Sequence, residues 1–126
     1  MLITFDWYDS EHSAFYVLYK VGWTWDEHHQ ILAQLRQWAD REGLAKTLGI
    51  FDLRGTTLPS GSLAKTHYSD PRPGSHIIIL MDHMVARTIT QIAILALRKQ
   101  HLFTIVSTED EAKALLEFYL NNHVTS

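Results

Sequence analysis

The alternation of apolar and polar residues at the start of the chain predicts a β-hairpin. Residues 2–8 alternate between the two classes, and residues 14–21 form a second run that is rich in aromatic and β-branched side chains. A short polar segment between the runs is typical of a turn, and Gly22 ends the second run. Two adjacent strands with these side chains are expected to pair antiparallel.

Apolar residues spaced three and four apart predict helices further along the chain. Thr24 and Glu27 have the spacing of a capping box, so we expect a helix over residues 25–42 that ends at Gly43. Thr108 and Glu111 repeat that spacing before a closing helix. Residues 85–99 are expected to form another helix, and a short, weakly patterned one is possible over residues 61–68.

Two runs, residues 46–53 and 76–81, are apolar on both faces and therefore resemble interior strands of a sheet. A further strand is predicted over residues 102–106, and these strands alternate with the predicted helices. Such alternation favours right-handed crossovers between parallel strands. We therefore predict a single α/β domain over residues 1–126, with a mixed, mainly parallel sheet of about five strands, an N-terminal hairpin and flanking helices.

The composition of the chain limits the kinds of binding partner and the cellular compartment that we expect. The chain has 126 residues and a formal charge of -3, which gives no electrostatic reason to expect a nucleic-acid partner. It has no cysteine, so disulfides and thiolate metal sites are excluded, and a reducing cytoplasm is expected. No apolar run is long enough for a membrane span, and the acidic, aromatic N-terminus does not resemble a signal peptide.

Motifs for catalysis or for a cofactor are weak. The eight histidines lack the paired helical spacing of a zinc site, so no metal is predicted. Ser60 and Ser62 do not lie in the Gly-x-Ser-x-Gly pattern of a hydrolase, and Gly55 and Gly61 are not followed by the Gly-Lys-Ser/Thr of a phosphate loop. An anion bound by free amides near residues 60–63 is physically reasonable. We expect neither a catalytic residue nor a cofactor.

The segment IFDLRGTTLPSGSL, residues 50–63, resembles the signature of STAS domains, the anti-sigma-factor-antagonist superfamily. Asp52, Leu53 and Gly55 match its first motif, and Arg54 stands where the family has a serine. A Ser-Gly-Ser-Leu sequence falls where the second motif belongs, one residue short. The order of predicted elements is similar to the family's over nearly the whole chain.

This resemblance implies a non-catalytic regulatory module that binds other proteins. Family members are often phosphorylated by a kinase on the serine at the start of the second helix, which corresponds here to Ser60 or Ser62. The acidic residue that precedes that serine in the family is Pro59 here. The implied partner is a regulatory protein, either a kinase or a sigma-factor regulator. The loop expected to contact a partner or an anion contains Asp52, Arg54, Gly55, Thr56, Thr57 and Gly61.

A small-ligand-binding domain is the alternative function. Trp23 and Trp25 flank the predicted start of the first helix, where they can staple the hairpin to the helix or stack on a ligand. Asp52 closes a strand at the carboxyl edge of the sheet, where open parallel sheets bind ligands. The expected site is an apolar pocket near these three residues, for a nucleotide, a lipid or another apolar or anionic metabolite.

The helix over residues 85–99 is apolar around its whole circumference, whereas a helix on one side of a sheet needs only an apolar stripe. We therefore expect a homodimer with Ile94 and Leu97 near the centre of the interface. The alternative is that the closing helix covers this face through Leu116 and Leu120.

Overall fold

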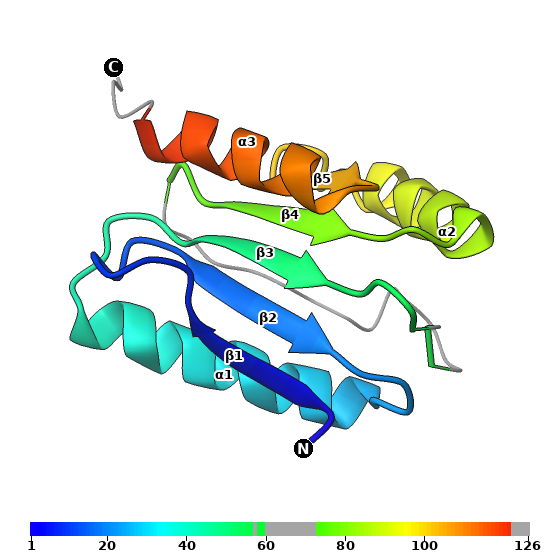
Figure 1. Cartoon of the computed structure of the whole chain (residues 1–126), viewed down its shortest axis with the longest axis horizontal. Helices are drawn as coiled ribbons and strands as arrows, with labels where there is room; N and C mark the ends of the chain where they lie inside the picture. The colour runs from blue at the N-terminus through cyan, green and yellow to red at the C-terminus, as the bar shows by residue number, and fades with distance from the viewer. Residues whose placement is uncertain (57, 60–72, 122–126) are drawn as a thin grey trace.

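A five-stranded mixed sheet organises the chain in the computed structural model, which describes residues 1–56, 58–59 and 73–121 (Figure 1). The strands lie in chain order, with the first pair antiparallel and every later pair parallel. This confirms the predicted α/β class and the hairpin. The strands are β1 (Ile3–Trp7), β2 (Phe15–Tyr19), β3 (Leu48–Asp52), β4 (His76–Leu80) and β5 (Phe103–Val106).

The described helices are α1 (Trp25–Arg41) after β2, α2 (Met84–Ala96) after β4 and α3 (Glu109–Asn121) after β5. The Thr24 hydroxyl accepts the Glu27 amide at 3.2 Å, as the capping-box spacing predicts. The other predicted hydrogen bond of the capping box, from the Thr24 amide to the Glu27 carboxylate, is wrong. The Glu27 carboxylate instead accepts hydrogen bonds from the amides of Leu2 and Ile3 at 2.9 and 3.0 Å. The carboxylate thereby fixes the first turn of α1 to the start of β1.

The other helix ends also have specific caps. The Thr108 hydroxyl accepts the Glu111 amide at 3.2 Å and donates to the Glu111 carboxylate at 3.0 Å, which supports the predicted start of α3. The cap of α2 is His83, whose Nδ1 accepts the Ala86 amide at 3.3 Å. The sequence did not predict this cap, and α2 ends at Ala96 rather than at residue 99. The helix predicted over residues 61–68 lies outside the described residues.

Two hydrophobic cores cover the two faces of the sheet. The first takes side chains from α1 and α2, together with Phe51 from β3. The second takes side chains from α3, including Leu116, together with Ile50 from β3. Successive residues of a strand point to opposite faces, so Phe51 and Ile50 assign α1 and α2 to one face and α3 to the other. Figure 1 shows α3 in front of the sheet beside β4 and β5.

The placement of α2 corrects the predicted dimer interface. Ile94 is only 6% exposed and packs into the first core, so it cannot lie at the centre of a contact between two chains. The closing helix does not cover the outer side of α2 either, because Leu116 belongs to the second core. The exposed apolar positions of α2, which we call its outer face, are Met84, Val85, Ile89, Ile92 and Leu95.

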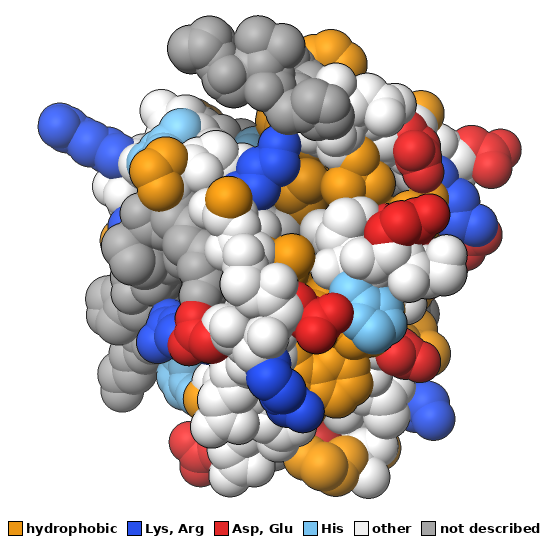
Figure 2. All heavy atoms as spheres, turned by 90° about the vertical axis from the view of Figure 1, so that its left-hand side faces the viewer, with side chains coloured by type: hydrophobic (Ala, Val, Ile, Leu, Met, Phe, Trp, Pro, Cys, Tyr) orange, Lys and Arg blue, Asp and Glu red, His pale blue; other side chains and the backbone are white. Residues whose placement is uncertain are grey.

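The end of the molecule near the amino ends of the parallel strands has a mixed surface. Figure 2 shows acidic, basic and apolar side chains interspersed there, without a large area of one charge sign. In the part of the chain that the structure describes, no helix is long and apolar enough to cross a membrane.

Candidate ligand pocket

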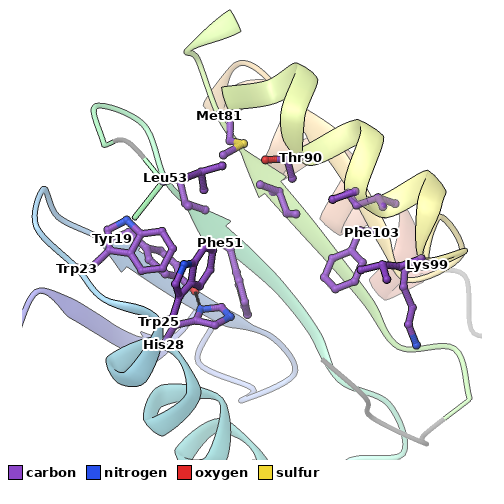
Figure 3. A pocket seen from close by; sticks show the side chains of 15 residues that line it. Tyr19, Trp23, Trp25, His28, Phe51, Leu53, Met81, Thr90, Lys99 and Phe103 are labelled. Carbon is purple, nitrogen blue, oxygen red and sulfur yellow. Dashed lines mark hydrogen bonds between the residues drawn. The ribbon is translucent and has the colours of Figure 1, made fainter. Parts of the chain in front are cut away.

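A pocket of about 340 Å³ lies on the face of the sheet that carries α1 and α2 (Figure 3). On this face α1 packs near β1 and α2 packs near β5. Among the described helices, neither therefore covers the middle strands that lie between them. Their side chains form the floor of the pocket, namely Phe51, Leu53, Ile79 and Met81. The volume is within the range of about 300–1,000 Å³ that is usual for small-molecule sites.

Aromatic side chains from the end of β2 and the start of α1 form one wall. The Trp23 and Trp25 rings meet edge to face, with centroids 4.8 Å apart and an interplanar angle of 87°. Trp23 also packs edge-on against Tyr19 at 4.9 Å. Edge-to-face contacts are a favourable arrangement of aromatic rings. The two tryptophans thus join the hairpin to α1, as the staple hypothesis predicts, and they also line the pocket.

The indole nitrogens in this wall have no hydrogen-bond partner. Trp23 is 3% exposed and Trp25 is partly buried, and the Nε1 atom of each ring is closed to solvent. Each of these nitrogens carries one donor hydrogen and cannot accept a hydrogen bond. Buried donors of this kind are normally paired, so the wall contains two unsatisfied N–H groups.

His28 completes the aromatic wall and is neutral at physiological pH. Burial, with a smaller contribution from neighbouring His29, lowers the pKa of His28 to about 4. The Tyr19 oxygen lies 2.8 Å from Nδ1 of His28, and burial raises the pKa of Tyr19 well above its ordinary value. The tyrosine hydroxyl therefore keeps its proton and can donate a hydrogen bond to Nδ1 of His28. In that arrangement the neutral imidazole carries its own proton on Nε2.

The opposite wall comes from α2 and the segment that follows it. The Thr90 hydroxyl already donates to the carbonyl of Ala86 at 2.7 Å, and Leu97 contributes an apolar side chain. Figure 3 shows Lys99 and Phe103 on this side, across the pocket from the two tryptophans. Among the described residues of the lining, none is a carboxylate or an amide, and Lys99 is the one lysine or arginine.

Asp52 does not belong to this pocket, which corrects the predicted ligand site. It ends β3 with its side chain on the α3 face and is 2% exposed. Its carboxylate accepts the Tyr16 hydroxyl at 2.6 Å and the Arg54 guanidinium at 2.8 and 3.0 Å. Burial alone would raise the pKa of Asp52, but the hydrogen bonds from Arg54 and Tyr16 outweigh it and hold the pKa below its ordinary value.

Arg54 is paired with two carboxylates of the chain. Besides Asp52, its guanidinium contacts the Glu109 carboxylate in the first turn of α3 at 3.0 Å. The hydrogen bond from Arg54 to Asp52 is the main reason that the pKa of Arg54 is raised. An anion would have to compete with two carboxylates for this side chain, so the geometry gives Arg54 a structural role in joining β3 to α3.

The next residues of the predicted loop form a turn. Gly55 has φ +75°, a conformation that glycine adopts at little cost, and the Thr56 amide and hydroxyl both donate to the Leu53 carbonyl at 3.2 and 3.0 Å. The remaining predicted loop residues, Thr57, Ser60, Gly61 and Ser62, lie outside the described residues. Within the described ranges, no three His, Asp or Glu side chains converge in a way that could hold a metal ion.

Sequence reasoning missed His28 and the floor of the pocket. His28 follows Trp25 by three residues, which places both side chains on one face of the helix, and this spacing is a signal that was available in the sequence. Comparisons of the chain with protein-family models, with curated proteins and with solved structures found no match.

Proposed function

We propose that this chain is a binding domain for a small, mainly apolar ligand. The observation that carries the proposal is the pocket between α1 and α2, whose floor and walls are mostly aromatic and aliphatic. A ligand in this pocket would remove apolar surface from water, which contributes about 25 cal/mol per Å². Concave, mostly apolar sites with a few convergent polar groups are the usual form of small-molecule sites.

The lining favours binding over catalysis. Its described residues include no carboxylate or serine that could act as a nucleophile, and the imidazole among them, that of His28, is paired with Tyr19. The polar groups that remain are N–H and ammonium donors, which orient a ligand and do not by themselves transform it. The described lining is therefore suited to recognition of a ligand.

A fluorescent dye gives a direct test of this function. We expect 1-anilinonaphthalene-8-sulfonate, an apolar anion, to bind with a dissociation constant of roughly tens of micromolar, because drug-sized ligands gain about 0.3 kcal/mol per non-hydrogen atom. Ala93 lines the pocket, so Ala93→Phe should fill the space and abolish binding. Ala96 is exposed on α2 and does not line the pocket, so Ala96→Phe is the matched control. Equal dye binding by both variants would contradict the proposal.

A second candidate is a protein-binding regulatory module of the STAS type. The observation in its favour is the position of Asp52, which ends β3, the middle strand of the sheet, as the resemblance implies. The proposal is tested by mapping phosphate on Ser60 or Ser62 in protein purified from its own host. If either serine is an acceptor, its replacement by Asp should weaken binding of the partner while leaving the melting temperature nearly unchanged. Absence of phosphate on both serines, across growth conditions, would count against it.

A further inference from the structure

One of the two edge strands of the sheet, β1, has most of its outward amides occupied (Figure 1). Its odd-numbered residues point their N–H and C=O groups away from β2. The outward amide of Ile3 donates to the Glu27 carboxylate at 3.0 Å, and that of Trp7 donates to the Asp6 carboxylate at 2.7 Å. Charged side chains on an edge strand hinder pairing with another chain. The edge at β1 is therefore protected.

The opposite edge strand, β5, has no such protection among the described residues. The carbonyls of Leu102 and Val106 accept amides from the β4 side at 2.7 and 3.0 Å. Because successive residues of a strand bond to opposite sides, Ile105 points its N–H and C=O groups out of the sheet. No described residue bonds to either group, and the strand Phe103–Val106 contains no charged side chain. This edge is therefore open to pairing with another strand.

An apolar surface lies beside this open edge. A groove of about 340 Å³ separates β5 from α2, and two residues of the outer face of α2 line it, Met84 and Ile92, which are 78% and 61% exposed. The described lining of the groove is completed by Ile105, Arg87, Thr88 and Gln91. Soluble monomers rarely expose contiguous apolar surface. A partner that pairs with β5 would cover this surface at the same time.

The charges on either side of β5 indicate which partner fits. The strand is preceded by basic residues and followed by acidic ones, namely Arg98, Lys99 and His101 before it and Glu109, Asp110 and Glu111 after it. In an antiparallel pair of two identical strands, the start of each strand lies beside the end of the other. A second copy of this chain would therefore bring basic and acidic segments together twice, once on each side of a two-fold axis.

Two of these charged residues are available for such a contact. Arg98 and Asp110 are exposed, and neither forms an ion pair with another described residue. Glu109, by contrast, already contacts Arg54 and Lys113. Arg98 and Asp110 are therefore the residues that we expect to meet between two copies.

We propose that two copies of this chain pair antiparallel through β5, so that two five-stranded sheets join into one continuous sheet. The N–H and C=O groups of Ile105 bond to those of Ile105 in the second copy. Because the two-fold axis is perpendicular to the joined sheet, both α2 helices lie on the same side of it, and their outer faces cover one another. This inference is independent of the ligand pocket and of the proposed function.

Charge reversal tests the orientation of the two strands. Arg98→Asp and Asp110→Arg should each weaken the dimer about tenfold in sedimentation equilibrium, because two symmetry-related attractions become repulsions. The double variant restores opposite charges and should recover an affinity close to that of the wild type. Arg98 has φ +57°, a conformation that Asp also tolerates. Lys20→Asp makes the same change of charge at an exposed site after β2, far along the sheet from β5, and is the matched control.

Hydrogen exchange tests the strand contact without any substitution. The Ile105 amide should exchange more slowly as the protein concentration rises and the dimer forms. The Phe5 amide points outward from β1, which lies outside the proposed contact, so its exchange should not change.

Three outcomes would overturn the proposal. A chain that stays monomeric at roughly tens of micromolar does not pair through this edge, which would then be left for a different partner. A dimer in which the exchange of the Ile105 amide is unchanged uses another surface. A double variant that stays as weak as the single variants shows that Arg98 and Asp110 do not meet across the contact.

Discussion

Protonation of His28 should destabilise the folded chain as the pH falls below neutrality. An ordinary histidine has a pKa of 6.5, whereas burial lowers that of His28 to about 4. Between these two values the unfolded chain binds a proton that the folded chain excludes, so the free energy of unfolding rises with pH across this window. The stability that the chain has with a neutral His28 is therefore fully present above about pH 7, and it is lost progressively as the pH falls to about 4.

The size of the effect follows from the two pKa values. Each pKa unit corresponds to 1.36 kcal/mol, so the contribution lost between pH 7.5 and pH 4.5 is about 2.5 kcal/mol. Other groups titrate over the same range, including His76, whose pKa is also lowered by burial. The effect of His28 is therefore the difference between the wild-type chain and His28→Asn, in which a side-chain oxygen can still accept from Tyr19.

Urea denaturation followed by circular dichroism at pH 7.5, 6.0 and 4.5 measures this difference. We expect His28→Asn to be less stable than the wild type at pH 7.5 but to lose about 2.5 kcal/mol less on acidification. Leu97→Ala changes the same pocket without removing a titrating group, so it should keep the wild-type pH dependence. If His28→Asn and the wild type lose the same stability, the imidazole is not excluded from protonation and the reasoning is wrong.

Three further predictions concern the other features of the fold. Asp52→Asn should lower the free energy of unfolding at pH 7 by about 2 kcal/mol, because it weakens the hydrogen bonds from Tyr16 and Arg54 to a buried charge. Glu109→Gln should cause a much smaller loss because Glu109 is exposed. Equal losses for the two variants in urea denaturation would contradict this account. Gly55→Ala should cost about 1 kcal/mol because of the positive φ, and Gly55→Asn should cost less in the same assay. We expect the chain to form a homodimer through the outer face of α2, and Ile92→Lys should prevent this association. A wild-type chain that stays at 14.5 kDa in sedimentation equilibrium, at roughly tens of micromolar, would contradict the dimer hypothesis.

The elements of the fold could be predicted because each depends on a local pattern. β3 and β4 are buried at every position, and such strands are visible as continuous apolar runs in the sequence. The starts of α1 and α3 were marked by Thr24 and Thr108, whose hydroxyls accept an amide three residues later. The partner of Glu27 could not be predicted in this way, because its carboxylate binds amides more than twenty residues away.

The orientation of α2 was hard to predict because exposed apolar residues, such as Ile89 and Ile92, stand beside its exposed polar residues Thr88 and Gln91. A polar residue of α2 is also misleading, because Thr90 is buried although it is polar. Its hydroxyl donates a hydrogen bond to the Ala86 carbonyl within the same helix. The buried side therefore contains Thr90 and Ile94, while Ile92 and Leu95 are exposed.

The candidate site was predicted in part. Trp23 and Trp25 line a pocket as the alternative function expected, but Asp52 was assigned to it wrongly. The period of a strand was sufficient to exclude Asp52, because Phe51 and Leu53 face the pocket and the residue between them must face the other layer. The width of the pocket could not be predicted, because it depends on how far apart α1 and α2 lie across the sheet.

The separation of α1 and α2 has a consequence for how the chain unfolds. One wall of the pocket and half of its floor come from residues 19–53, and the rest comes largely from residues 79–103. A bound ligand would touch both groups and act as a non-covalent cross-link between the two halves of the sequence. Ligand binding to the folded state alone raises stability by mass action, and here it would also couple the halves, so that amides in α1 and α2 become protected from hydrogen exchange together rather than independently.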